Sequence, residues 1–154
     1  MIPGVRAPNP QGRFFGLSAL LVEDNERLRR VLELSLGEIG FEVRSAPNGD
    51  AARQVLEDGL CPSLLFTDIR MPGQLNGVQL ASWAQRHCPD LRVLLQTGYV
   101  EEDARPFRVL RKPFTADELI EAIQAALGSE VPAGRVAINR PSASPWSAVA
   151  GPTP

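Results

Sequence analysis

Short apolar runs alternate with longer segments of helical periodicity between residues 17 and 127. Strands that alternate with helices are typical of βαβ units, in which helices cover both faces of a parallel sheet. The first run, residues 17–22, is apolar except for Ser18, as expected for a strand that is buried on both faces. Four further runs follow at 41–46, 63–67, 92–96 and 107–111. The pattern therefore predicts an α/β domain with a five-stranded parallel sheet.

The helical segments carry recognisable beginnings and ends. After the first strand, apolar residues recur at three- and four-residue spacing from Leu28 to Ile39, and charged residues occupy the opposite face. Gly40 and Gly59 are natural helix stops. The sequence Thr115-Ala116-Asp117-Glu118 has the spacing of a capping box and predicts the beginning of the last helix.

Proline usage marks the edges of this domain. Of fourteen prolines, three lie in residues 1–16 and five in residues 128–154. The second of these segments is rich in Pro, Ser and Ala and shows no helical or strand period. We therefore expect a flexible N-terminal segment over 1–16, one domain over 17–127 and a disordered tail over 128–154.

Composition excludes several classes of protein. The chain has 18 acidic and 16 basic residues, a formal charge of -2, which argues against a nucleic-acid or membrane-surface binder. No stretch approaches the roughly 20 apolar residues of a membrane span. The two cysteines, Cys61 and Cys88, match neither a C-x-x-C motif nor a disulfide-rich framework, and His87 is the only histidine. We expect reduced cysteines, a cytoplasmic protein, and neither a zinc site nor histidine-based catalysis.

Polar residues stand at the ends of four of the five predicted strands. These residues are Glu23 and Asp24, Asp68, Thr97 and Lys112. Ligands of open parallel sheets bind at the carboxyl ends of the strands, so these side chains are candidates for one site. Three carboxylates at one edge repel one another unless a hard cation lies among them, and Mg²⁺ prefers such oxygen ligands. With a metal present, a carboxylate can attack a phosphoryl group, assisted by a hydroxyl and an ammonium group.

Each of these residues also has an ordinary explanation. Acidic residues such as Glu23 and Asp24 are favoured at the beginning of a helix. Asp68 stands before a turn, and threonine is common in strands. A lysine before a proline, as at Lys112, is usually a solvated surface residue. Their conjunction at four separate strand ends favours a functional site.

Four stretches carry a resemblance to a known family. They are Leu-Val-Glu-Asp-Asn at 21–25, Leu-Phe-Thr-Asp-Ile-Arg-Met-Pro-Gly at 65–73, Leu-Leu-Gln-Thr-Gly-Tyr at 94–99, and Leu-Arg-Lys-Pro-Phe at 110–114. Together they resemble the receiver domain of two-component response regulators, over roughly residues 19–127. The resemblance implies a flavodoxin-like, doubly wound sheet with strand order 2-1-3-4-5 and a cis bond at Lys112-Pro113.

The resemblance also assigns roles to the candidate residues. It implies that Mg²⁺ is held by Glu23, Asp24, Asp68 and the backbone carbonyl of Arg70. It further implies that Asp68 takes a phosphoryl group from a histidine kinase or a histidine phosphotransfer protein. Thr97 would bond the phosphate on switching, and Lys112 would pair with it.

Two features depart from the family pattern. Fourteen residues separate Thr97 from Lys112, and about nine remain once the fifth strand is subtracted, so we expect the fourth helix to be reduced or missing. Val109 stands where the family commonly has a Tyr or Phe that swings inward on phosphorylation. Tyr99 is a candidate to substitute for that switch residue or to shield the phosphoaspartate from water.

The sequence therefore predicts a phosphoacceptor without an output domain of its own, which acts as a relay, a phosphate sink or a regulator of a partner. Its only chemistry would be its own phosphorylation and dephosphorylation. One alternative is a pseudo-receiver that serves as an unphosphorylated interaction scaffold. A second is a Mg²⁺-dependent phosphatase, but position 70 is Arg where that class has a second aspartate. Arg27, Arg29 and Arg30 are either kinase contacts or an ordinary solvated helix face.

Overall fold

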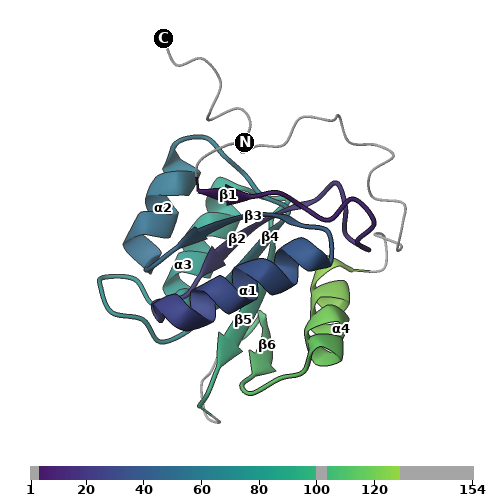
Figure 1. The fold of residues 1–154 in the computed structure, drawn as a ribbon. Coiled ribbons are helices and arrows are strands. Elements are labelled where there is room, and N and C mark those ends of the chain that lie inside the picture. The colour runs from purple at the N-terminus through teal and green to yellow at the C-terminus, as the bar shows by residue number, and fades with distance from the viewer. Residues whose placement is uncertain (1–3, 100–103, 129–154) are drawn as a thin grey trace.

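The computed structural model describes residues 4–99 and 104–128 of the chain. Its centre is a six-stranded sheet in the order β1-β3-β2-β4-β5-β6 (Figure 1). The strands are β1 (Val5–Arg6), β2 (Ser18–Val22), β3 (Glu42–Ala46), β4 (Leu64–Asp68), β5 (Arg92–Thr97) and β6 (Arg108–Arg111). Strands β2 to β6 pair in parallel in the order predicted for the five strands, which confirms the doubly wound fold.

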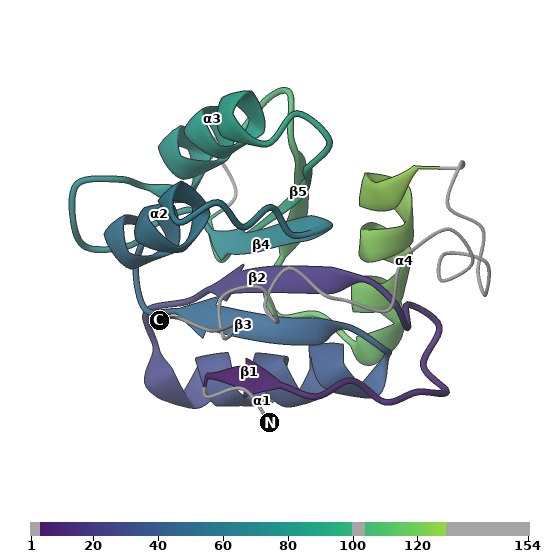
Figure 2. The same cartoon turned by 90° about the horizontal axis from the view of Figure 1, so that it is seen from above.

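Two helices cover each face of the sheet (Figure 2). The helices are α1 (Glu26–Glu38), α2 (Gly49–Glu57), α3 (Gly77–His87) and α4 (Ala116–Leu127). Helices α2 and α3 pack on one face, and α1 and α4 pack on the other. Each begins at a side-chain cap, and the capping box predicted at Thr115 is present.

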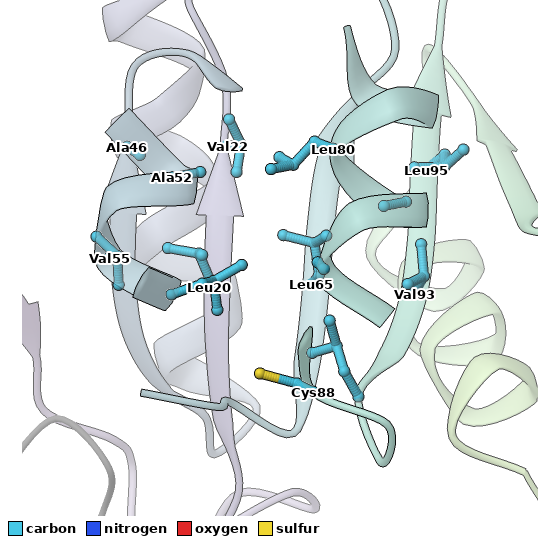
Figure 3. Packing of buried hydrophobic residues seen from close by; sticks show 14 of the residues in the cluster. Leu20, Val22, Ala46, Ala52, Val55, Leu65, Leu80, Cys88, Val93 and Leu95 are labelled. Atoms are coloured by element: carbon cyan, nitrogen blue, oxygen red, sulfur yellow. The ribbon is translucent and has the colours of Figure 1, made fainter. Parts of the chain in front are cut away.

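The apolar runs are buried because both faces of the central strands are covered. Along β2, Leu20 and Val22 pack under α2 and α3, whereas Leu21 faces α1 and α4. Figure 3 shows the cluster under α2 and α3, in which Leu20 of β2 and Leu65 of β4 lie close to Leu80 of α3. Residues 17–22 are therefore almost entirely apolar because the strand is covered on both faces, as predicted.

The N-terminal segment departs from the expectation. Strand β1 pairs antiparallel with β3 at one edge of the sheet. Phe14 is 3% exposed and stacks on Phe41 with 5.0 Å between the ring centroids, and its backbone N–H donates to the carbonyl of Ile39. Residues 4–16 therefore belong to the domain, which corrects the boundary placed at residue 17. A two-residue strand has no periodicity from which it could be predicted.

The connection between β5 and β6 agrees with the predicted loss of a helix. Among its described residues, 98–99 and 104–107, none is helical. The peptide bonds before Pro106 and Pro113 are cis, the second as the resemblance implied. Most of the tail predicted to be disordered, residues 129–154, lies outside the described part of the chain.

The two cysteines were expected to be reduced, but they form a disulfide. The sulfur atoms of Cys61 and Cys88 are 2.10 Å apart, and the Cα atoms are 5.7 Å apart. Cys61 precedes β4 and Cys88 follows α3, so the topology brings together two loops that are 27 residues apart in sequence. The spacing of the two cysteines in the sequence does not predict this disulfide, because only the tertiary fold brings Cys61 and Cys88 together.

Candidate functional site

Three carboxylates meet at the carboxyl edge of the sheet. Strands β2 and β4 are parallel neighbours, so Glu23 and Asp68 lie at adjacent strand ends. Glu23, Asp24 and Asp68 each place a carboxylate oxygen within 4.8 Å of the other two. Glu23 is 1% exposed and Asp68 7% exposed, whereas Asp24 is open to solvent. This all-oxygen donor set, with one side open to water, fits the preference of Mg²⁺.

Lys112 lies next to this cluster. It follows β6, and its backbone N–H donates to the carbonyl of Thr97. Its Nζ donates to Asp68 Oδ2 at 3.0 Å and lies 3.4 Å from Glu23 Oε1. One ammonium group therefore contacts both buried carboxylates.

Burial controls the protonation of these groups. Burial raises the pKa of Asp68 above its ordinary value, although the hydrogen bond from Lys112 opposes the shift. Burial also raises the pKa of Glu23. The hydrogen bond from the backbone N–H of Asn25 lowers this pKa, and the negative charge of Asp68 raises it further. For Lys112, burial alone would lower the pKa, but the hydrogen bond and charge of Asp68, together with Glu23, raise it overall. The ammonium group is thus held charged beside carboxylates that it does not fully neutralise.

The structure adds Gln96 to the site, a residue that the sequence patterns had not indicated. Gln96 is fully buried on β5, and its Nε2 donates to Glu23 Oε1 at 3.2 Å. The other carboxylate oxygen, Glu23 Oε2, accepts the backbone N–H of Asn25 at 3.1 Å. Both oxygens of Glu23 are therefore held by donors. The available signal was a single amide in the otherwise apolar run Val93-Leu94-Leu95-Gln96.

The loops after β4 and β5 meet beside the cluster. Thr97 is buried at the end of β5, and its Oγ1 accepts the backbone N–H of Tyr99 at 3.0 Å. The exposed ring of Tyr99 stacks against the guanidinium group of Arg70. The distance from the Arg70 Cζ atom to the centroid of the ring is 3.9 Å. Val109 lies on β6 and is partly exposed. The structure thus links Tyr99 to the loop that follows Asp68.

The three arginines of α1 differ in their contacts. Arg29 donates from Nη1 to the carbonyl oxygen of Glu23 at 2.8 Å, so it supports the site from within the chain. Arg30 pairs with Glu26 one turn earlier, at 3.0 Å. Arg27 is exposed. Only Arg27 and Arg30 therefore present a solvated face of the kind that a partner could contact.

A doubly wound sheet with an acidic cluster and a lysine at its carboxyl edge defines a class of signalling domain. The chain belongs to the response regulator receiver domain family, whose sequence profile matches residues 19–124. It is 36% identical over 115 residues to the response regulator receiver protein CpdR of Brucella abortus, covering 70% of this chain and 94% of that protein. It is 31% identical to the DNA-binding transcriptional regulator NtrC of Azospirillum brasilense, of which it spans 24%.

Solved structures give the same result. A response regulator receiver protein from Sinorhizobium medicae superposes with a TM-score of 0.68 at 27% identity, covering 74% of this chain and 96% of that one. The response regulator TrrA from Thermotoga maritima, solved in complex with Mg(2+)-BeF, has a TM-score of 0.64 at 28% identity, with 71% and 98% covered. Within residues 4–99 and 104–128, no helix has the length and apolarity needed to cross a membrane.

Proposed function

We propose that this chain is a phosphoacceptor of a two-component system and that Asp68 takes the phosphoryl group. One observation carries the proposal: the Asp68 carboxylate lies at the end of β4, bonded to Lys112 and within 4.8 Å of the carboxylates of Glu23 and Asp24. A buried carboxylate between a fixed ammonium group and a cation site has the surroundings that phosphoryl transfer requires.

In the proposed reaction, a carboxylate oxygen of Asp68 attacks phosphorus and the bond from phosphorus to the donor histidine nitrogen breaks. Lys112 already donates to Asp68 Oδ2 and offsets negative charge next to the reacting oxygen. Glu23, Asp24, Asp68 and the backbone carbonyl of Arg70 would hold Mg²⁺. When bound, the metal supplies neutralisation of charge on the transferring phosphoryl oxygens.

We further assign the response to phosphorylation to Thr97 and Tyr99. The Thr97 hydroxyl accepts from the backbone of Tyr99, so its own proton is available for a phosphate oxygen. Movement of Thr97 toward a phosphoryl group would pull on the segment that carries Tyr99 and its contact with Arg70. Val109 has no polar atom or ring with which to report the change, which leaves Tyr99 as the switch residue or the shield against water.

The donor is proposed to be a histidine kinase or a histidine phosphotransfer protein, seated on α1. A hollow of about 380 Å³ lies between α1 and the residues that follow β6, lined by Leu28, Val31, Leu32, Lys112, Phe114 and Leu119 among others. Because Lys112 lines this hollow and bonds Asp68, a protein seated there lies next to the phosphoacceptor. Val31 is an exposed apolar residue of α1 that lines this hollow.

The output is proposed to be that of a relay, a phosphate sink or a partner regulator acting in the cytoplasm. CpdR, of which this chain covers 94%, is likewise described as a receiver protein. Arg70 occupies the position at which an aspartyl phosphatase needs its second acid, which argues against turnover of an external phosphate ester.

The test is the intact mass of the protein after incubation with Mg²⁺ and acetyl phosphate, beside the Asp68→Ala variant. We expect one phosphoryl adduct on the wild type and none on the variant. A phosphorylated histidine kinase then replaces acetyl phosphate as the donor. Absence of the adduct with both donors would overturn the proposal and favour an interaction scaffold.

A further inference from the structure

The disulfide lies at the edge of the sheet opposite the phosphoacceptor. Cys61 precedes β4 and Cys88 precedes β5, so both stand at the amino ends of strands whose carboxyl ends carry Asp68 and Thr97. Strands of this length separate the two edges by roughly 16 Å. Figure 3 shows Cys88 at the base of the core cluster, below Leu65 and Val93. The pair is therefore independent of the site described above.

The two half-cystines differ in their access to solvent. Cys88 is 2% exposed and packs in the core, whereas Cys61 is exposed on the loop after α2. Thiol–disulfide exchange requires a thiolate to reach one of the two sulfur atoms. We therefore expect an incoming thiol to reach the disulfide at Cys61, with Cys88 as the leaving group.

The two loops are held together by hydrogen bonds that do not involve sulfur. The backbone N–H of Arg92 donates to the carbonyl of Ser63 at 3.1 Å and joins the two loops directly. Ser63 is also fixed to Ser18 in β2, and Cys88 is fixed by its N–H to the carbonyl of Ala84. None of these hydrogen bonds depends on sulfur, so we expect them to survive cleavage of the S–S bond and to keep the two thiols close enough to form it again.

A hollow next to the disulfide gives room for a small thiol. It measures about 430 Å³ and is lined by both cysteines together with Pro62, Ser63, Asp90 and Arg92 among others. The lining residues thus include an acidic, a basic and a hydroxyl residue, together with the apolar residues Leu17, Leu91 and Leu127. Such a lining suits a zwitterionic peptide thiol of the glutathione class better than a purely apolar compound.

We propose that Cys61 and Cys88 form a reversible thiol–disulfide modification site that reacts with low-molecular-weight peptide thiols through Cys61. In reduction, a peptide thiolate attacks Cys61 Sγ, the S–S bond breaks and Cys88 leaves as a thiolate. A second peptide thiolate attacks the mixed disulfide, releases Cys61 and forms the peptide disulfide. Two peptide thiols supply the two electrons and two protons that convert the cystine to two cysteines. Oxidation is the reverse, with the peptide disulfide as electron acceptor.

The first experiment uses glutathione as the probe. The full chain is equilibrated with reduced or oxidised glutathione, denatured in N-ethylmaleimide and weighed intact. We expect two alkylated thiols after reduced glutathione and none after oxidised glutathione, with the same result for Asp68→Ala. Two free thiols in oxidised glutathione, or a disulfide between two chains, would overturn the proposal.

The second experiment identifies the sulfur that is attacked. In oxidised glutathione under native conditions, we expect the Cys88→Ser variant to gain one glutathione on Cys61. We expect the Cys61→Ser variant to react at least about tenfold more slowly, because its remaining thiol, that of Cys88, is buried. Equal rates would contradict the assignment. Because serine at buried position 88 can disturb packing, the wild type is also quenched during reduction and mapped by peptide mass. Glutathione found on Cys88 rather than on Cys61 would overturn the proposal independently of any variant.

Discussion

Gln96 holds Glu23 from a strand position where an apolar side chain would otherwise pack. Its Nε2 donates to Glu23 Oε1. Its own Oε1 is buried without a hydrogen-bond partner among the described residues, so keeping the amide at this position costs stability. We expect Gln96→Met to weaken Mg²⁺ binding by about 10- to 100-fold, because groups that orient a metal ligand commonly have effects of this size. Isothermal titration with Mg²⁺ measures the change.

The matched control for this prediction is Gln85→Met. Gln85 also donates through its amide, to the carbonyl of Leu91 at 3.3 Å, but at the amino end of β5. We expect its Mg²⁺ affinity to equal that of the wild type. An unchanged affinity in Gln96→Met would show that Gln96 has a packing role alone.

The raised pKa values of Asp68 and Glu23 predict how pH acts on stability. Burial raises both, so the folded chain binds these protons at a higher pH than the unfolded chain. Without metal, the free energy of unfolding therefore falls as pH rises through the window between the unfolded and folded pKa values. Mg²⁺ needs the deprotonated carboxylates, so we expect its stabilising effect to be largest above that window and to vanish below it.

Melting temperatures across a pH series, with and without Mg²⁺, test this expectation. A variant with both Asp68→Asn and Glu23→Gln is the control, and we expect it to lose both the Mg²⁺ effect and the fall in stability with rising pH. A Mg²⁺ effect in the wild type that persists unchanged down to the ordinary range of carboxyl pKa values would contradict the prediction.

At the residue scale, the sequence is most informative about side chains that stand at strand ends. The sequence places Glu23, Asp68 and Lys112 at one edge because the carboxyl ends of parallel strands lie together, and the structure brings these side chains into contact. Their chemical roles stay predictions. Gln96 was missed because its partner is 73 residues away and only the register of β2, β4 and β5 places the two together.

Helix α3 begins directly against the end of β4. The backbone N–H of Gly77 donates to the carbonyl of Ile69, and a Cβ atom added at Gly77 would lie 2.2 Å from the carbonyl oxygen of Asp68. We expect Gly77→Ala to lower the free energy of unfolding by about 1–3 kcal/mol, because backbone must shift to admit the methyl group. Urea denaturation measures the change.

Gly98→Ala is the matched control for the packing of α3. Among residues 4–99 and 104–128, an added Cβ at Gly98 meets no atom within 4 Å. We therefore expect a change within about 0.5 kcal/mol, as for surface positions in general. Equal losses in the two variants would mean that the close approach of α3 to β4 is not what Gly77 permits.

The N-terminal segment supplies a second prediction for an element. Phe14 is 3% exposed and stacks on Phe41, whereas the adjacent Phe15 is 39% exposed. We expect Phe14→Ala to lower the free energy of unfolding by about 3–5 kcal/mol, the usual range for a buried phenylalanine. Phe15→Ala should cost much less in the same urea titration. Similar losses in both variants would contradict the packing of this segment as part of the domain.

Helices and strands whose apolar residues recur at a regular spacing were predictable from the sequence, and elements without such a spacing were not. The helices and the five parallel strands carry apolar spacing or caps that place them close to their observed bounds. Strand β1 has two residues, and its pairing with β3 depends on tertiary contact. The reduced connection after β5 was predictable because chain length alone limits it.

For the whole molecule, the sheet divides the surface into regions with separate chemistry. The carboxyl edge carries the acidic cluster, the amino edge carries the disulfide, and α1 and α4 cover the face that leads to Lys112. The alternation of strands and helices in the sequence predicts the position of the acidic cluster, because doubly wound sheets bind ligands at the carboxyl ends of their strands. The disulfide was not predictable, since it depends on how two loops from different βα units meet.

The surface of α1 carries the last prediction. Val31 is 54% exposed and lines the hollow beside Lys112, whereas Leu34, 53% exposed on the same helix, is not among its lining residues. We expect Val31→Glu to slow phosphotransfer from a phosphorylated histidine kinase by at least about tenfold, because it places a charge in an apolar contact. Phosphorylation by acetyl phosphate, which needs no docking, should be unchanged.

Leu34→Glu separates the hollow from the helix as a whole. It adds the same charge at an equally exposed apolar position of α1 outside the hollow, so we expect phosphotransfer within about twofold of the wild-type rate. The donor is a phosphorylated histidine kinase that transfers its phosphoryl group to the wild-type chain. The rate of transfer is measured as the loss of phosphate from the kinase. Equal slowing in both variants would place the donor on the outer face of α1, and a loss with acetyl phosphate would mean that Val31 supports the phosphoacceptor site itself.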